Sequence, residues 1–496
     1  MDWIKLFNCE RLGESENTDT FNADRTSFQR DFDRIVFSSA FRRLQSKTQV
    51  FPLPKADFIH TRLTHSLETS CVGRSLGSLV GRQILENNKE LEKHGITCDV
   101  FAAVVANACL AHDIGNPPFG HSGEDAISGY FRSDRAKIFL EGLTDAQIAD
   151  FQNFEGNALG FRILTHTLPR QSKLTGGLGL TFATLATFAK YPRGSVTHPF
   201  ISSKEGSCEG EPHTSPKRLC GIEFDSSPKN LSDREAKKTT TENNKTDSVC
   251  EKKFGFFDSE KSTFEKVASK TELIHKEGRA AWFRHPLAFL VEAADDICYR
   301  IMDLEDGVKL NLISFKEAEE LLLELLEKAN WDSNKYEGVI DKREKLNYLR
   351  AKTISALIAW VAESFMQNYD SLMKGKFTYS LIDTTPAKPV LDKIQKVSIK
   401  KIYNYRKVIE IESAGFEVLS GLLDLFLNAV LGEKTDRNKC NIKLVPEQFL
   451  PFDEQLKTGE GRYEAIMNII QFISGMTDTY AMDTYKSLKG ISLPVY

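Results

Sequence analysis

The segment VFAAVVANACLA, residues 100–111, constrains the fold of this chain more than any other part of the sequence. It is apolar on nearly every side of a helix, and such a helix is stable only when other elements cover it all round. The sequence therefore predicts a central, fully buried helix that other helices must enclose.

Helical periodicity also dominates much of the remaining chain. Apolar residues recur at spacings of three to five residues over 63–85, and of three and four residues over 287–304, as on a buried helical stripe. Alternation typical of strands is confined to the short segments 47–51 and 253–257. We therefore expect an all-α fold with a few short strands.

A polar segment interrupts the helical pattern at about residues 195–251. It is rich in Ser, Thr, Lys, Glu, Asn and Pro, and it cannot bury enough apolar area to offset its ordering entropy. We interpret it as a polar surface insertion within one domain. The prediction is a single unit over residues 1–496, with a catalytic core over about 30–310 and a helical C-terminal region over about 311–496.

The composition bounds the compartment and the partners. A formal net charge of −4 excludes a globally basic nucleic-acid binder. No apolar stretch approaches the roughly 18 uninterrupted residues of a membrane span, and the first residues lack the apolar region of a secretory signal. The nine cysteines have no CxxC spacing, which argues against a disulfide framework. We expect a cytoplasmic protein without a membrane segment.

The buried helix ends at His112 and Asp113, and the breaker sequence IGNPPFG separates these residues from His121 and Glu124. An aspartate at the negative end of a helix dipole is unfavourable unless a cation lies beside it. A divalent metal ion would supply this charge, since imidazole and carboxylate together suit first-row divalent ions. His65, in another predicted helix, is a further candidate ligand.

A fourth candidate ligand lies in the sequence VEAADDICYRIMDLED. Asp295, Tyr299 and Asp303 follow one another along one flank of the predicted helix. Asp296 has Arg300 four residues on, which predicts an ordinary ion pair. Asp295 has no such partner, and an acid in so apolar a helix is costly unless its charge is compensated. We therefore assign Asp295, rather than Asp296, to the metal.

These residues and their flanking segments resemble the deoxyguanosine triphosphate triphosphohydrolases, a family of HD-domain metal phosphohydrolases. The segments that carry the resemblance are, in chain order, RRLQSKTQVFP, TRLTHSLE, AHDIGNPPFGHSGE, FEGNALG, EAADDICY and SGMTDTYA. The resemblance implies a helical HD-domain fold. It also implies a reaction in which dGTP, or another deoxynucleoside triphosphate, and water give a deoxynucleoside and inorganic triphosphate.

The resemblance also implies roles for individual residues. The metal ligands are His65, His112, Asp113 and Asp295. The ion is Mn²⁺ or Mg²⁺, with Fe²⁺ and Co²⁺ as further candidates, and it would acidify water and neutralise phosphate oxygens.

The catalytic and substrate-binding positions follow from the same motifs. His121 transfers a proton and Glu124 orients it. The substrate-binding residues are Gln49, Arg62, Lys190, Tyr299 and Asp303, of which Gln49 and Asp303 read the deoxyribose. The family further implies a homo-oligomer, a hexamer or tetramer.

Two other functions use the same features. Broader HD-domain nucleotidases and phosphodiesterases share the metal ligands, and only the substrate-binding positions argue against them. A sensor regulated by a nucleotide or by single-stranded DNA is suggested by the basic stretch 392–407, where Tyr403 and Tyr405 could stack on bases. The simpler interpretation of that stretch is a solvated basic helix face.

Overall fold

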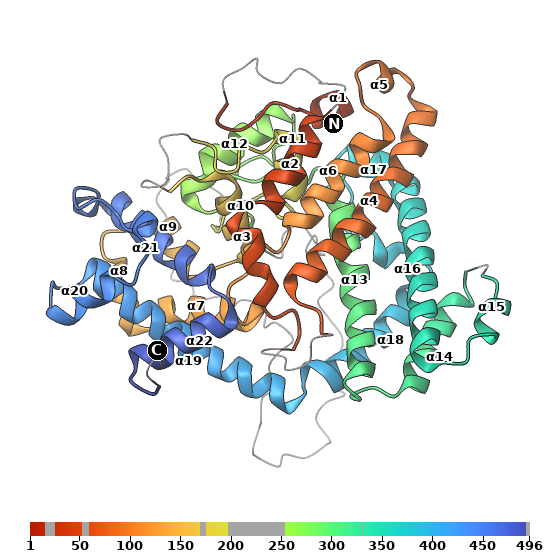
Figure 1. Cartoon of the computed structure of the whole chain (residues 1–496). Coiled ribbons are helices and arrows are strands. Elements are labelled where there is room, and N and C mark those ends of the chain that lie inside the picture. The colour runs from red at the N-terminus through yellow and green to blue at the C-terminus, as the bar shows by residue number, and fades with distance from the viewer. Residues whose placement is uncertain (15–24, 52–58, 169–174, 197–252, 330, 493–496) are drawn as a thin grey trace, which may run out of the picture.

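The structure is a computed structural model, and it describes the chain except for residues 15–24, 52–58, 169–174, 197–252, 330 and 493–496 (Figure 1). The polar segment 195–251 therefore lies almost wholly outside the described residues. β-Pairing within the described residues is limited to isolated bridges, such as the one between Thr48 and Thr61. The predicted all-α fold is confirmed. Of the two predicted strands, 47–51 contributes only this bridge, and 253–257 forms none.

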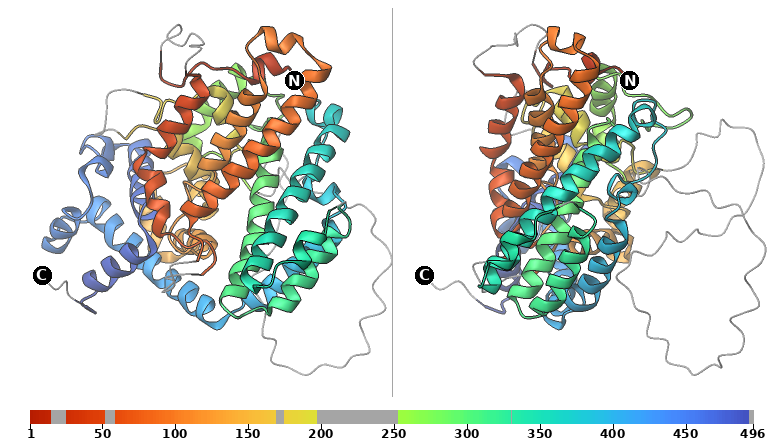
Figure 2. Two further views of the ribbon diagram at one scale, coloured as in Figure 1. Left: turned by 45° about the vertical axis from the view of Figure 1, so that its right-hand side comes forward. Right: turned by 90° about the vertical axis from the view of Figure 1, so that its right-hand side faces the viewer.

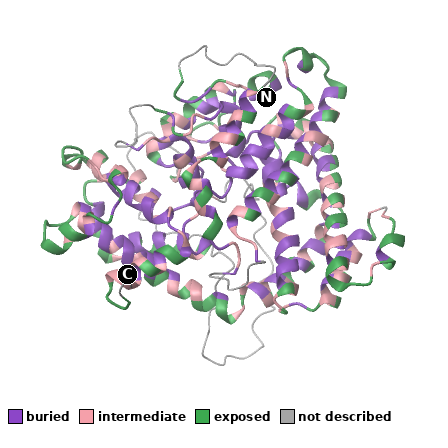
Figure 3. Ribbon diagram, viewed as in Figure 1, coloured by how far each residue is buried: buried purple, intermediate pink, exposed green. Residues whose placement is uncertain are grey.

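The central buried helix of the prediction is α6 (Cys98–Ala111). It packs against α2 (Ser27–Val36), α4 (Arg62–Asn87), α11 (Phe182–Phe188) and α13 (Ala288–Lys309). Figure 3 shows these helices as largely buried elements in the middle of the molecule.

The contact between α4 and α6 depends on glycines that recur every four residues on α4. A Cβ atom at Gly77 would lie 2.7 Å from the carbonyl oxygen of Phe101, which is too close for any other residue type. The two backbones therefore approach closely, and this brings the start of α4 beside the end of α6.

The first hydrophobic core extends from the central helices to the helices that follow α13. Views turned about the vertical axis show α13, α14 and α16 side by side (Figure 2). The helices of this part of the chain are α14 (Phe315–Leu326), α15 (Asn334–Glu337), α16 (Lys342–Gln367), α17 (Tyr369–Met373), α18 (Lys388–Ser398) and the π-helical turn η6 (Ile399–Tyr403). Shorter helices of the first core are α1 (Trp3–Leu6), α3 (Ser39–Arg42), α5 (Glu90–Lys93) and α12 (Lys261–Lys270).

A second hydrophobic core joins the middle of the chain to its C-terminal end. Its helices from the middle of the chain are α7 (Gly120–Arg132), α8 (Lys137–Leu140), α9 (Asp145–Gln152) and α10 (Gly156–Thr165). Its C-terminal helices are α19 (Arg406–Leu431), α20 (Asp436–Ile442), α21 (Gly459–Ser474) and α22 (Asp478–Leu488). The residues after 311 are thus divided between the two cores.

Helix α19 is long and apolar enough to cross a membrane by length and composition alone. Many of its apolar residues lie inside the second core, where Leu422, Leu423 and Phe426 are fully buried. This is the environment of a core helix in a globular protein. The six cysteines within the described residues are free thiols, as expected for a chain without a disulfide framework.

A buried arginine joins the two cores. Arg162 of α10 is 0% exposed, and its Nη1 lies 2.6 Å from Glu260 just before α12. Its Nη2 contacts Glu464 and Asn468 of α21 at 2.6 and 3.1 Å. Burial would lower the pKa of Arg162, but the two glutamates raise it above its usual value. Removal of the guanidinium would therefore leave Glu260 as a buried charge without its cation.

We predict that Arg162→Met lowers the free energy of unfolding by about 3–5 kcal/mol, because breaking a buried ion cluster leaves uncompensated charge. Guanidinium denaturation followed by circular dichroism measures the change. The control is Arg406→Met, which removes an exposed Arg406–Glu410 pair and is expected to have little effect. Equal midpoints for the two variants would contradict the prediction.

Candidate functional site

Three of the predicted metal ligands converge where α4 and α6 meet. A capping box at Thr61 starts α4, which places His65 in the first helical turn. Helix α6 ends at Ala111, so His112 is its C-cap and Asp113 follows directly. One ligand atom from each of His65, His112 and Asp113 lies within 4.8 Å of the others, and all three residues are buried.

The fourth predicted ligand, Asp295, reaches the same point from α13. Its Oδ1 lies 3.1 Å from His65 Nε2 and 3.4 Å from His112 Nε2. We call His65, His112, Asp113 and Asp295 the His–Asp cluster. Its members come from three helices that pack against one another, so the packing of the central helices sets the geometry of the cluster.

The orientation of His112 suits a metal ligand. Its Nδ1 is 2.6 Å from the carbonyl oxygen of Cys109, so Nδ1–H donates and Nε2 presents its lone pair to the cluster. That Nε2 is buried and has no hydrogen-bond partner among the described residues. Two imidazoles and two carboxylates form a donor set that fits a divalent first-row ion.

Each carboxylate of the cluster has its own cation. Arg62 Nη1 lies 2.6 Å from Asp113, and Lys190 Nζ lies 2.7 Å from Asp295. Burial would raise the pKa of Asp295, but Lys190 and the histidines lower it well below its usual range. Burial would also raise the pKa of Asp113, but Arg62 and the nearby histidines outweigh burial and lower it below its usual range. Both acids are therefore ionised at neutral pH, as metal ligands must be.

Asp296 lies outside the cluster. Ser380 Oγ donates to it at 3.4 Å, and burial raises its pKa to about 7. The ion pair expected between Asp296 and Arg300 is not formed, since none of the ion pairs of the described residues joins them. Arg300 acts on Asp296 only at longer range, and its Nη1 is buried without a hydrogen-bond partner in the described part of the chain. A spacing of four residues permits a pair but does not enforce it.

The breaker loop turns the chain back toward Arg62. Phe119 has a φ of 63° and Gly120 a φ of 60°, and α7 begins at Gly120. A Cβ atom at Gly120 would lie 2.8 Å from Arg62 Nη2, so a larger residue there would displace the guanidinium. His121 follows in the first turn of α7 and is exposed to solvent. Its predicted role in proton transfer requires such access.

Glu124, the predicted partner of His121, is buried one turn further along α7. Its Oε1 accepts a hydrogen bond from the Gly156 amide at 2.7 Å, and Lys253 lies 3.7 Å from its Oε2. Glu124 thus binds the first turn of α10, and its proposed effect on His121 stays a prediction.

Tyr299 and Asp303 lie along one flank of α13, as the periodicity predicts, and a residue from far along the chain joins them. Tyr403 donates to Asp303 Oδ2 at 2.5 Å, and its ring stacks on Tyr299 with centroids 5.8 Å apart. Burial raises the pKa of Asp303 to about 8. Sequence reasoning placed Tyr403 in a basic surface stretch. Tyr403 lies in a π-helical turn, a rare element that often marks functional sites. Because the sequence does not reveal such a turn, it could not predict that Tyr403 reaches the site.

Gln49 lies on the segment that pairs with the residue before α4. The Thr48–Thr61 bridge holds this segment next to Arg62. Gln49 Oε1 is buried and has no hydrogen-bond partner among the described residues. An unpaired buried acceptor is costly unless a ligand satisfies it.

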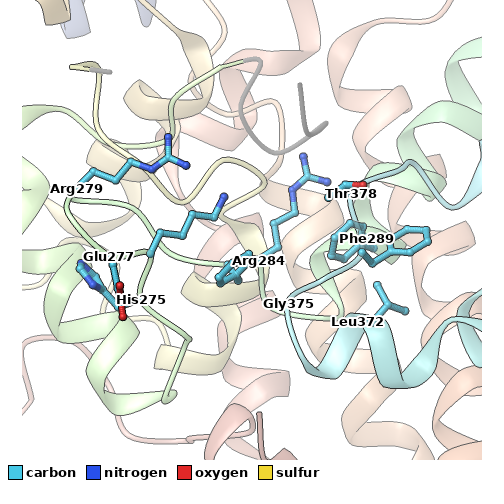
Figure 4. Close-up of a pocket in the computed structure, with 11 residues that line it drawn as sticks. His275, Glu277, Arg279, Arg284, Phe289, Leu372, Gly375 and Thr378 are labelled. Atoms are coloured by element: carbon cyan, nitrogen blue, oxygen red, sulfur yellow. The ribbon is translucent and has the colours of Figure 1, made fainter. Parts of the chain in front are cut away.

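A cavity of about 450 Å³ lies between the segment 275–289 and residues 372–378 (Figure 4). Lys276, Arg279, Phe283 and Phe289 help to line it, together with Arg284, whose Nε donates to the carbonyl oxygen of Lys190. None of the predicted site residues lines this cavity, so the cavity is separate from the His–Asp cluster.

The fold and the cluster define the class of protein. Two histidines and two aspartates that converge from buried helices are the arrangement of an HD-domain protein, and residues 62–151 match the HD domain family.

Relatives identify the family within this class. The chain is 41% identical to a deoxyguanosinetriphosphate triphosphohydrolase-like protein of Synechocystis sp., over 99% of the chain and 100% of the relative. It is 35% identical to a protein of the same description from Pseudomonas aeruginosa, over the full length of both. A deoxyguanosinetriphosphate triphosphohydrolase of Klebsiella pneumoniae is 30% identical over 94% of each chain. The chain therefore belongs to the deoxyguanosinetriphosphate triphosphohydrolase family and is an HD-domain hydrolase.

We predict that Asp295→Asn and Asp296→Asn differ sharply. Asp295→Asn removes a charged ligand atom from the cluster, so bound metal and activity should fall by more than the roughly 10–100-fold that loss of an outer contact costs. Asp296→Asn should keep its metal, because Asp296 lies outside the cluster. Elemental analysis of the purified variants, with circular dichroism as the check on folding, makes the comparison. Equal metal loss in both variants would show that Asp295 is not the ligand.

Proposed function

We propose that this protein is a metal-dependent triphosphohydrolase that converts dGTP, or another deoxynucleoside triphosphate, to deoxynucleoside and inorganic triphosphate. The observation that carries the proposal is the His–Asp cluster with its two cations, within a chain that matches the triphosphohydrolases over its full length. His65, His112, Asp113 and Asp295 would hold the ion. When bound, Mn²⁺ or Mg²⁺, or else Fe²⁺ or Co²⁺, supplies a Lewis acid at phosphate and lowers the pKa of water.

The cations of the site have a second use in this proposal. Arg62 and Lys190 now neutralise the carboxylates of the cluster. A polyanionic triphosphate entering the site would attract the same two groups, and an ion held by the carboxylates would replace the charge that they supply. Arg62 and Lys190 can therefore bind phosphate oxygens without leaving Asp113 and Asp295 uncompensated.

The reaction breaks the bond between the α-phosphorus and O5′ of the sugar. Water attacks the α-phosphorus, its oxygen stays on the triphosphate, and O5′ takes up a proton as the nucleoside leaves. His121, exposed at the start of α7, is the residue proposed to move that proton. Glu124 keeps the first turn of α7 against α10 through its hydrogen bond to Gly156.

The sugar would be recognised between Gln49 and the tyrosine pair. Gln49 has an unsatisfied acceptor, and Asp303 is held by Tyr403 beside Tyr299. Burial raises the pKa of Asp303 to about 8, so its carboxyl is largely protonated at neutral pH and can both donate to and accept from a sugar hydroxyl.

The alternatives have less support. A nucleotidase would need the same His–Asp cluster, but it would leave Gln49, Tyr299 and Asp303 without a role. Binding of single-stranded DNA would need Tyr403 as a stacking surface, but Tyr403 already packs on Tyr299. The basic residues Lys393 and Lys401 form ion pairs with acids of α14. A cytoplasmic homo-oligomer, a hexamer or tetramer, with a possible regulatory nucleotide, remains part of the proposal.

The products test the proposed reaction. We expect dGTP with Mn²⁺ or Mg²⁺ to give deoxyguanosine and triphosphate in equal amounts on ion-exchange analysis. In ¹⁸O water the label should enter the triphosphate, since water attacks phosphorus. Release of dGMP and pyrophosphate would refute the proposed bond cleavage, and hydrolysis of nucleoside monophosphates alone would support the nucleotidase.

Sugar recognition gives a second test. We expect dGTP to be hydrolysed much faster than GTP, and Tyr403→Phe to reduce that preference about 10-fold, because it leaves the buried Asp303 carboxyl without its hydrogen-bond partner, which costs about 1–3 kcal/mol. The ratio of kcat/KM values for the two substrates measures it. Tyr405→Phe is the matched control, and an equal effect of both changes would remove Tyr403 from the sugar site.

A further inference from the structure

The SGMTDTYA segment near the C-terminus reaches two loops of the site through one carboxylate. Asp478, the first residue of α22, is 1% exposed. Its Oδ2 accepts hydrogen bonds from the Thr48 amide at 2.9 Å and from the Thr48 hydroxyl. Its Oδ1 accepts from the Phe119 amide at 3.1 Å. Asp478 therefore links segments that lie 430 and 359 positions away along the chain.

A buried lysine makes a parallel link. Lys47 Nζ donates to the carbonyl oxygens of Asn116 and Ser474, each at 2.6 Å. Burial, with the nearby charge of Arg62, lowers the pKa of Lys47 to about 7. We call Lys47, Thr48, Ser474 and Asp478 the C-terminal clamp. It joins the turn between α21 and α22 to both site loops.

Both clamped loops carry residues of the proposed reaction. Gln49 directly follows Thr48, and His121 lies two residues after Phe119. The same loops contact the cluster, since Asn116 Nδ2 donates to Asp113 Oδ1 at 2.5 Å and the Arg62 amide donates to the carbonyl oxygen of Lys47 at 3.2 Å. The clamp thus holds the two loops that carry Gln49 and His121, and none of its four residues is a proposed metal ligand.

Phe119 shows why the loop needs a fixed partner. It holds a left-handed backbone conformation, which is unfavourable for a bulky residue and persists only when the surroundings determine it. Asp478 binds its amide, and its ring packs closely on α19, where a Cβ atom at Gly415 would lie 2.8 Å from Phe119 Cγ. Both contacts come from the C-terminal part of the chain.

We propose that Asp478 is a positioning residue that fixes the two loops that carry Gln49 and His121, an inference that rests on the proposed function. Only a carboxylate meets the requirement, because three donors point at its two oxygens. An amide at position 478 would turn its NH₂ group toward one of those donors and break one side of the clamp.

The test compares Asp478→Asn with Asp483→Asn, an exposed acid of the same helix. Amide hydrogen exchange should quicken at Thr48 or Phe119 in Asp478→Asn and remain as in wild type in the control. Metal content should be retained. We expect kcat for dGTP to fall roughly 10–100-fold, since small misplacements of reacting groups cost that much. The preference for dGTP over GTP should narrow at the same time.

The substrate preference separates positioning from mere destabilisation. A smaller folded fraction lowers the rate for dGTP and GTP equally and leaves KM unchanged, whereas displacement of Gln49 changes their ratio. Unchanged exchange, kcat and preference in Asp478→Asn would overturn the inference. An equal loss for both substrates would also overturn it.

A milder variant keeps the inference testable if Asp478→Asn does not fold. Thr48→Val removes only the hydroxyl donor to Asp478, and it should narrow the dGTP preference in the same direction, while Thr48→Ser restores it. A preference equal to that of wild type in Thr48→Val would overturn the inference. If wild type hydrolyses no deoxynucleoside triphosphate, the proposed function fails, and the exchange rates alone decide whether Asp478 holds the two loops.

Discussion

Two buried carboxylates impose the constraint on which the site depends. Asp113 and Asp295 lie among apolar helices, where an isolated charge would be too costly to keep. Arg62 and Lys190 compensate them at 2.6 and 2.7 Å, so the cluster can persist as a set of ionised acids. In the proposed function the same cations would also bind a polyanionic substrate. Arg62 begins α4 and Lys190 follows α11, so both uses of these side chains require the elements that carry them to be held rigidly.

Much of that rigidity could be predicted from the sequence, and the reasons are local. The composition of residues 100–111 permits only a buried helix, and its termination at His112 follows from the breakers after it. Periodicity likewise located α4 and α13. The strand predicted over 253–257 was wrong, because its phenylalanines fill both hydrophobic cores from an irregular segment that alternation cannot distinguish from a strand. The predicted pair of Asp296 with Arg300 was also wrong, since tertiary contacts such as Ser380 compete with helical spacing.

The contacts that the sequence does not reveal join distant parts of the chain. Tyr403 meets Asp303 from 100 positions away, and it does so from a π-helical turn whose backbone cannot be inferred from a basic, tyrosine-containing stretch. Asp478 meets Thr48 across 430 positions. Both residues stand in segments that sequence reasoning noted, one as a basic stretch and one as a family motif. Their roles depend on packing between segments that are distant in sequence, within the first core for Tyr403 and between the C-terminal helices and the site loops for Asp478, which no periodicity encodes.

In the proposed function, the metal ligands and the residues that hold the sugar-facing groups in place come from different parts of the chain. The His–Asp cluster and its cations all lie between Arg62 and Asp295, on helices of the first core and the segment beside them. Asp303, which would face the sugar, is held by Tyr403, and the loops that carry Gln49 and His121 are held by Asp478. Both Tyr403 and Asp478 lie in the C-terminal part of the chain. The second core seats Phe119 and α7 against α19, so the late helices complete the loop that begins at the metal ligands. On the proposed function, a change in the C-terminal helices would therefore alter selectivity while the metal ligands stay in place.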